Sequence, residues 1–373
     1  RPDQYVGVTT YKGNNTVGRI IDIGRNADLV WVKKRTAENN ILVDTVRGEN
    51  NFLMSDSGNQ ANTSGGPITG IGATVYNGFI VDNNGYVNAN NADYVCWNWK
   101  AGGAPTATNT QSSGAMTANS VSVDGVLQSA YTPSGSPTIY PKKMSVGTKQ
   151  GFSIVQYEGN NTSGATLPHG LTQAPDFFVT KATNYDNREW QAYHQALGNQ
   201  QPIRLNTDQA AQSANAAYFN NTSPTASVVT FGNGGDANQG GETTLTYVMY
   251  AWHDVPGLQK FGTFTGNADS GGNGPFVELG FRPALVWFKA TTGTQPWNIF
   301  DSERGKINPI DEGLLINTNA NEFTGTARVD YLSNGFKVRA PSGGNPNVAT
   351  TYIYCAWAEA PSVDLYGGGA NAR

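Results

Sequence analysis

Residues 261–305 read FGTFTGNADSGGNGPFVELGFRPALVWFKATTGTQPWNIFDSERG, and this stretch decides the fold. It holds a Gly/Asn-rich turn, a short alternating strand and then an aromatic run that ends at Lys289. Near-copies of its turn, FTGNADSG at 264–271, occur as YKGNNTVG at 11–18 and YEGNNTSG at 157–164. Because an aromatic run that ends in Lys also follows each copy, the chain is predicted to be a threefold internal repeat.

The repeat boundaries follow from two markers. A lysine ends the first aromatic strand and a tryptophan ends the last strand of each unit: Lys33 and Trp99, Lys181 and Trp252, Lys289 and Trp357. These pairs are 66, 71 and 68 residues apart, and such small differences are what length changes in turns leave behind. We therefore expect repeats at 1–101, 150–256 and 257–361, joined by a linker with a hairpin at 102–149 and followed by a flexible tail at 362–373.

The composition predicts an all-β protein. Only 14% of the 373 residues are charged, against roughly 25% in an ordinary domain, and 45 Gly and 18 Pro suit many turns. The runs TYVMYAW at 246–252 and TYIYCAW at 351–357 carry large residues on both faces, as central strands do. Units of about 100 residues with turns between short strands favour an antiparallel two-sheet sandwich, each closing its own apolar interior.

The segment between the first two repeats has two parts. Residues 103–119 are rich in Ala, Thr and Ser, which is typical of a linker. Residues 120–127 read SVSVDGVL and predict a hairpin with its turn at Asp124-Gly125, which we expect to reach another repeat or another subunit. By contrast, only Gly257 and Leu258 separate the second and third repeats, so we expect these two to pack as a rigid pair.

Charge and hydropathy exclude several classes of function. The net charge is −4 without a basic stripe, which argues against nucleic-acid binding. No apolar run reaches the roughly 18 residues of a membrane span, so no membrane insertion is expected. Cys96 and Cys355 are expected in the core rather than in a disulfide. The chain opens on Arg1 without a signal peptide, and we expect its N-terminus to be processed or missing.

No catalytic residues are predicted. A glycosidase needs two carboxyl groups about 5–9 Å apart, and Asp301 with Glu303 is the nearest candidate pair. The matching turn of the first repeat also holds an Asp and an Arg, at Asp44 and Arg47. This recurrence favours a structural interpretation in which the Asp caps the turn and pairs with the Arg. We therefore expect a protein that is not an enzyme.

No cofactor or metal is expected either. His169, His194 and His253 lack any metal-ligand spacing and are expected to be polar turn or surface residues. Calcium stays open as an alternative, because residues 82–93 and 236–238 offer several oxygen ligands without the order of a calcium loop.

Aromatic residues of two loops are candidates for stacking on a sugar ring. The predicted ligand-binding residues are Tyr185, Arg188, Trp190 and Trp297. Trp190 and Trp297 occupy equivalent places in their repeats, so core packing is the alternative interpretation for both.

Several short runs resemble a repeated domain of tailed-phage virion proteins, frequent in phages of marine and cyanobacterial hosts. The runs are PHGL at 168–171, APDF at 174–177, WQAYH at 190–194 and YAWH at 250–253, with GFRP at 280–283 continuing them. The resemblance covers nearly the whole chain, and the first repeat is the most divergent. It implies a concanavalin-like, jelly-roll sandwich in a tail fibre or another exposed part of the virion, and it implies no catalytic residues.

The expected function is that of a tail-fibre or receptor-binding component which recognises host surface glycans. One alternative is a capsid decoration or head-fibre protein with a purely structural role, and a lesser alternative is a glycan depolymerase. Expected partners are other virion subunits and a surface glycan, with a homo-oligomer, by resemblance a trimer, at the virion surface.

Overall fold

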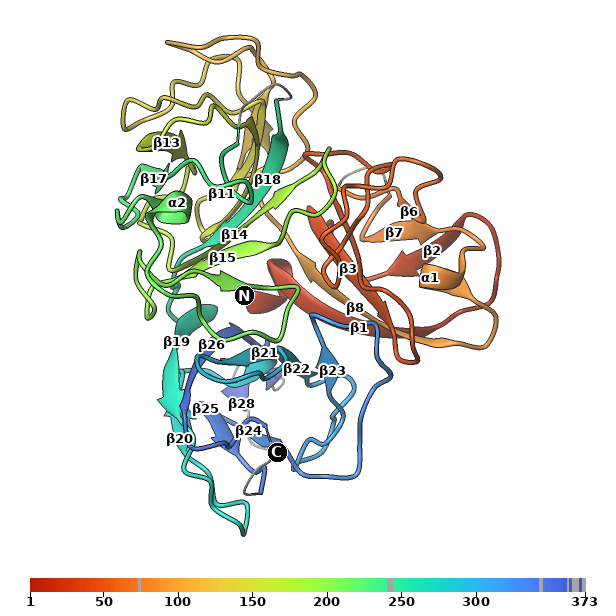
Figure 1. Ribbon diagram of the computed structural model, residues 1–373. Coiled ribbons are helices and arrows are strands. Elements are labelled where there is room, and N and C mark those ends of the chain that lie inside the picture. The colour runs from red at the N-terminus through yellow and green to blue at the C-terminus, as the bar shows by residue number, and fades with distance from the viewer. Residues whose placement is uncertain (73–74, 240–243, 342–344, 361, 364–368, 371–373) are drawn as a thin grey trace.

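The computed structural model describes residues 1–72, 75–239, 244–341, 345–360, 362–363 and 369–370. Its regular structure is almost entirely β-strand, which confirms the all-β fold class. Figure 1 shows three lobes that meet near the middle of the molecule. We call them lobe 1 (1–101), lobe 2 (150–256) and lobe 3 (257–361).

Lobe 1 pairs a five-stranded sheet in the order β1-β8-β3-β4-β5 with a three-stranded sheet in the order β2-β7-β6. The strands are β1 (Val6–Lys12), β2 (Arg19–Asp22), β3 (Leu29–Lys34), β4 (Ile41–Asp44), β5 (Leu53–Met54), β6 (Ile68–Thr69), β7 (Gly78–Val81) and β8 (Asp93–Trp99). Two short helices, η1 (Pro2–Gln4) and α1 (Gly85–Asn88), complete the lobe.

Lobe 3 repeats this plan with the sheets β19-β26-β21-β22-β23 and β20-β25-β24. The strands are β19 (Gln259–Thr265), β20 (Phe276–Glu278), β21 (Pro283–Ala290), β22 (Asn298–Asp301), β23 (Leu314–Leu315), β24 (Val329–Leu332), β25 (Gly335–Val338) and β26 (Thr351–Ala358). The predicted flexible tail at 362–373 lies mostly outside the described residues, within which β27 (Ser362–Val363) pairs with β28 (Gly369–Ala370).

Lobe 2 has the same core strands, but its larger sheet is extended to eight strands in the order β10-β9-β11-β12-β18-β14-β15-β16, opposite the pair β13-β17. The strands of the lobe are β12 (Phe152–Glu158), β13 (Ala165–Pro168), β14 (Phe177–Ala182), β15 (Gln191–His194), β16 (Ile203–Arg204), β17 (Val228–Phe231) and β18 (Thr246–Trp252), with helix α2 (Ala216–Phe219). The added strands come from residues 102–149, which we call the insertion: β9 (Val121–Val123), β10 (Val126–Leu127) and β11 (Lys143–Gly147).

The insertion contains the predicted hairpin. Asp124 and Gly125 both have positive φ, +50° and +87°, as the two central residues of a type I′ turn require. The hairpin reaches the end of lobe 1, because the Gly125 N–H donates to the Gly102 carbonyl over 2.8 Å. It also joins lobe 2, since β9 pairs in parallel with β11 and β11 pairs with β12.

A shared apolar core lies where the lobes meet. Each lobe has a cluster of its own between its two sheets, and a fourth cluster draws buried residues from all three. At its centre, the rings of Trp99, Trp252 and Trp357 stand edge to face with centroids 5.4 to 6.2 Å apart. The sequence predicts that each repeat closes its own interior, and each lobe does so. The shared core is additional, because the second face of each large sheet is buried against the other lobes.

The three tryptophans are related by register. Trp99 faces Leu29, Trp252 faces Phe177 and Trp357 faces Leu285, the matching positions of β3, β14 and β21. The lobes are therefore arranged as a pseudo-threefold unit in a single chain. Lobes 2 and 3 are in direct contact, as the short connection between them predicts, and lobe 1 contributes equally to the central triangle.

Three hydrogen bonds between buried groups, one for each pair of lobes, join the lobes around the shared core. The Tyr250 hydroxyl of lobe 2 donates to the Asp44 carboxylate of lobe 1 over 2.7 Å, and the Trp97 indole of lobe 1 donates to Asp301 of lobe 3 over 3.0 Å. His194 holds the equivalent position in lobe 2, and its Nε2 lies 3.1 Å from the Tyr354 carbonyl oxygen of lobe 3. Each lobe thus bonds the central strand of another lobe.

The lysines that marked the repeats are also structural. Lys33, Lys181 and Lys289 are fully buried, and each ammonium group donates to two backbone carbonyls. Two of these bonds cross between lobes, from Lys181 to Gly58 and from Lys289 to Asp208. Burial lowers the pKa of each of the three lysines to about 8.

Because these lysines are buried, we expect the chain to become more stable as the pH rises above 8. Their pKa is lower in the folded chain, about 8, than the 10.5 of an exposed lysine, so folding releases protons between these values. The free energy of unfolding should increase from pH 8 to pH 10, by at most about 1.4 kcal/mol per pH unit for each lysine. Urea unfolding at several pH values checks this. Lys181→Met should reduce the slope by about a third, whereas Lys306→Met, at a side chain that is 67% exposed, should leave it unchanged. A flat profile in the native chain would contradict the prediction.

Candidate functional site

A groove lies between lobe 1 and the insertion. It encloses about 590 Å³, which lies within the range of small-molecule binding sites. Lobe 1 and the residues that leave it supply one wall, and the hairpin supplies the other. The lining residues are Asn26, Asp28, Ile71, Gly72, Lys100, Gly103, Ala104, Thr106, Ser122, Gly125 and Leu127.

The groove exists because the hairpin is held against the end of lobe 1. The Ser122 hydroxyl and the Gly125 N–H both donate to the carbonyl of Gly102. A side chain at Gly102 would collide with the backbone of Ser122 and Val146, so only glycine allows the two segments to approach this closely. The hairpin therefore has a defined place beside lobe 1.

Asp28 forms part of the groove lining and organises the backbone around it. Its carboxylate accepts hydrogen bonds from the N–H groups of Ala101 and Gly103, over 2.7 and 3.2 Å, and from the Thr45 hydroxyl over 3.0 Å. Burial raises the pKa of this carboxyl, and these hydrogen bonds oppose the rise. Asp28 holds the turn that leads out of β8, so its function in the groove is to shape the wall.

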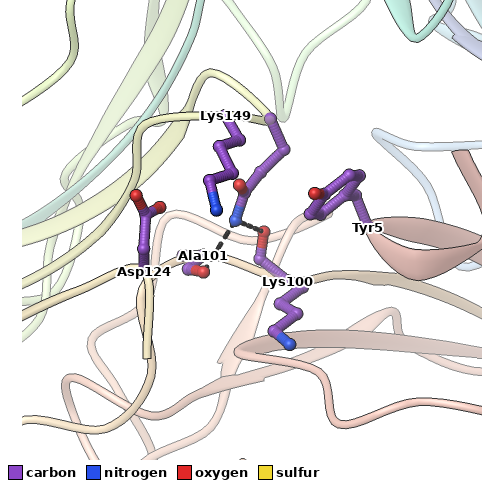
Figure 2. A pocket seen from close by; sticks show the side chains of 6 residues that line it. Tyr5, Lys100, Ala101, Asp124 and Lys149 are labelled. Carbon is purple, nitrogen blue, oxygen red and sulfur yellow. Dashed lines mark hydrogen bonds between the residues drawn. The ribbon is translucent and has the colours of Figure 1, made fainter. Parts of the chain in front are cut away.

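A smaller pocket of about 130 Å³ adjoins the groove and shares Lys100 with it. Figure 2 shows Lys149, Asp124 and the hydroxyl end of Tyr5 directed toward the same space. The side-chain amide of Gln150 donates to the carbonyls of Lys100 and Ala101, over 3.0 and 2.7 Å, and so fixes the strand end that separates the two cavities.

The charges of this region favour a ligand that accepts hydrogen bonds. Lys100 and Lys149 form no ion pair with any acidic residue in the described part of the chain. The nearby Asp124 is already engaged, because its two oxygens accept from the N–H and hydroxyl of Thr148 over 2.9 and 2.6 Å. The Lys100 ammonium group, which lines the groove, and the Lys149 ammonium group, which lines the smaller pocket, can thus each donate to a carboxylate or hydroxyl oxygen of a ligand.

The sequence-predicted ligand residues lie elsewhere. Trp190 and Trp297 are fully buried, and their indole N–H groups donate to backbone carbonyls of the preceding lobe, at Met54 and Arg204. The stacking role predicted for these two is therefore corrected, since neither ring offers a face to a sugar. They fasten one lobe to the next, as Asn40 does from lobe 1 by its bond to Thr318.

Tyr185 and Arg188 are the two loop residues among those candidates. Tyr185 is 44% exposed, and the Arg188 guanidinium lies 5.1 Å from the centre of its ring. Arg188 also donates to the side chain of Gln239 over 2.7 Å. Neither residue lines the groove, and a contact between this loop and a glycan stays a prediction.

The two candidate carboxylates differ in burial: Asp301 is buried, whereas Glu303 is half-exposed. One oxygen of Asp301 accepts from the N–H groups of Glu303 and Arg304, and the other accepts from the Arg304 side chain over 2.7 Å and from Trp97. Glu303 is half-exposed and lies within reach of Lys306. Asp44 and Arg47 form the same buried pair in lobe 1, so the turn-capping interpretation describes both sites.

The histidines and the acidic loops also have structural partners. All three histidines are buried rather than exposed, which corrects that expectation, and burial lowers the pKa of His169 and His194 to about 4. In the loop considered for calcium, Asn238 accepts from the Asn160 N–H and donates to the carbonyls of Thr162 and Gly232. No cluster of His, Cys, Asp and Glu suited to a metal occurs among the described residues, and no helix among them could span a membrane.

Comparison with known families gives one match. A family model described as a domain of unknown function, DUF7483, matches residues 1–139 and 129–361. The chain belongs to the DUF7483 family. No curated protein and no solved structure matches it. The two DUF7483 matches overlap at residues 129–139, inside the insertion, and every residue that lines the groove lies in the first of them.

Sequence reasoning missed the groove residues. The turn chemistry of Asp124-Gly125 located the hairpin, but nothing in the sequence showed that Lys100 and Lys149, at the two ends of the insertion, would lie by the same hairpin. The nearest sequence indication was the insertion itself, which occurs after only one of the repeats.

Proposed function

We propose that this chain is a non-enzymatic protein of a phage virion surface that binds a host surface glycan in the groove between lobe 1 and the insertion. The groove carries the proposal, because it has the volume of a short saccharide and combines the Lys100 ammonium group with apolar wall residues, while Lys149 lines the adjoining pocket. The resemblance to tailed-phage virion domains is the reason for the proposed location.

The chemistry of the lining suits a sugar. The hydroxyl and carboxylate groups of a glycan accept hydrogen bonds, which Lys100 and Asn26 can donate from the lobe 1 wall. The apolar side chains of Ile71 and Leu127 can cover the C–H face of a sugar ring. Because single sugar contacts are weak, several copies of the chain on one virion would raise the effective affinity.

The test is glycan binding by purified protein, together with competition against phage adsorption to host cells. Lys100→Ala combined with Lys149→Ala should weaken glycan binding at least tenfold while the thermal midpoint stays unchanged, because neither side chain has an ion-pair partner in the described structure to lose. The matched control is Lys306→Ala, an exposed lysine of lobe 3, which should bind normally. Full binding by the double variant would refute the groove as the site.

A purely structural role is the second candidate, and the shared core favours it. The buried polar side chains that join the lobes suit a part of a capsid decoration or head fibre that must stay rigid. The position of the protein in an electron-microscopy map of the particle separates the two candidates. The depolymerase alternative is tested by measuring the release of reducing sugar from host polysaccharide. Activity that persists in Glu303→Ala would exclude Glu303, the half-exposed member of the carboxylate pair, as a catalytic residue.

A further inference from the structure

The three lobes differ in whether the strands at one side of the sandwich pair with an additional segment. The strands at this side are β1 and β2 in lobe 1, β12 and β13 in lobe 2, and β19 and β20 in lobe 3. In lobes 1 and 3 both strands stand at the edges of their sheets, whereas in lobe 2 the insertion adds β11 beside β12. We call this side of a lobe its open side.

The insertion also covers β13. The N–H groups of Thr138 and Ile139 donate to the carbonyl of Thr166 over 3.2 and 2.9 Å, and the Thr166 N–H donates to the Thr138 hydroxyl over 2.9 Å. The Ile139 side chain is buried in the lobe 2 core. Residues 136–140 of the insertion thus lie on the edge of β13 as an added extended segment.

The equivalent residues of the other lobes are Ile20 and Phe276. Ile20 pairs with Ile80, Thr166 with Thr230 and Phe276 with Lys337, at matching places of the three small sheets. Three residues further along, the N–H groups of Ile23, His169 and Leu279 donate across to β7, β17 or the residues beside them.

Because hydrogen-bonded and non-hydrogen-bonded pairs alternate in an antiparallel ladder, this register fixes the direction of the backbone at Ile20, Thr166 and Phe276. All three turn their N–H and C=O groups away from the paired strand. In lobe 2 these outward groups are satisfied by Thr138 and Ile139. In lobes 1 and 3 no segment among the described residues pairs with the same groups, and such an edge is a template for strand addition.

Apolar side chains are exposed at the same two places. Ile20 is 59% exposed and Phe276 is 44% exposed, and Val17 lies three residues from Ile20 at 66%. At the equivalent place, lobe 2 carries the polar Thr166 and is covered. An outward backbone edge with an exposed apolar residue is the combination that binds an extended peptide.

We propose that the open sides of lobes 1 and 3 each bind an extended segment of a partner protein, which adds to the edge of β2 or β20 as residues 136–140 add to β13. The segment would supply an aliphatic side chain at the place of Ile139 and backbone N–H groups to the outward carbonyl of Ile20 or Phe276. Among the described residues, the insertion is the segment that adds to such an edge, and it already occupies lobe 2, so we assign the proposed segment to a partner protein.

The test uses the full chain and a synthetic peptide of residues 132–142, TPSGSPTIYPK, the one segment that the structure shows on such an edge. Peptide binding is measured by fluorescence anisotropy, and hydrogen exchange locates the protected amides. We expect saturable binding with protection at residues 18–22 and 276–278. The double variant Ile20→Asp/Phe276→Asp should weaken binding at least tenfold with an unchanged thermal midpoint, because both side chains are exposed. A peptide with Ile139→Asp should also lose binding.

Three results would overturn the proposal. One is no binding at millimolar peptide, and another is equal binding by the double variant. The third is self-association of the native chain that the double variant abolishes, since a second copy would then be the occupant. These experiments change no residue of the groove, so the proposed glycan binding is tested independently of this proposal.

Discussion

Asp301→Ala is expected to destabilise the chain by about 3 kcal/mol. The substitution leaves the buried Arg304 guanidinium without its main partner and the Trp97 indole without an acceptor. Breaking a buried ion pair costs about 3–5 kcal/mol, and the lower end applies because Glu322 still contacts Arg304 over 3.0 Å. Urea unfolding, read as the change in midpoint at constant slope, measures this loss.

Glu303→Ala is the matched control two residues away. Its side chain is half-exposed and only 3.8 Å from the exposed Lys306, so the free energy of unfolding should change by at most about 0.5 kcal/mol. Equal effects of the two substitutions would contradict the structural assignment of Asp301. Such a result would reopen the interpretation of the two carboxylates as a working pair.

Trp252→Ala should have the largest effect, about 3–5 kcal/mol, as expected for truncation of a buried tryptophan. The Trp252 ring contacts both Trp99 of lobe 1 and Trp357 of lobe 3. Its indole nitrogen has no hydrogen-bond partner among the described residues, so the cost arises from lost packing and the cavity left behind. Calorimetry or urea unfolding gives the magnitude.

The distribution of this effect tests the shared core. Amides of β8 and β26 should lose protection from hydrogen exchange together with those of β18, because the cavity opens between all three lobes. Tyr185→Ala, at an exposed position of the same lobe, should leave all three sets unchanged. Loss of protection confined to lobe 2 would mean that the lobes are stable separately.

Local turn and strand patterns predicted the elements of this fold well. The Asp124-Gly125 hairpin formed as expected, because a type I′ turn depends on the φ preferences of two residues. The Asp-Arg turn was also recognised, since its bonds join residues only three positions apart. The prediction that Trp190 and Trp297 stack on a sugar was wrong. Trp190 and Trp297 are buried by contacts with another lobe, which a pattern within one repeat does not contain.

The sequence by itself determined that the chain is all-β and built from three related units, because alternation, turn residues and repeated motifs are local properties. Only the tertiary structure decided that the units share a tryptophan core, that the insertion covers the open side of lobe 2, and that a groove lined by Lys100 lies beside lobe 1. These features depend on contacts between residues from about 50 to more than 200 positions apart. Spacing along a chain does not specify which of the possible long-range pairings buries the most apolar surface, and that free energy selects the arrangement.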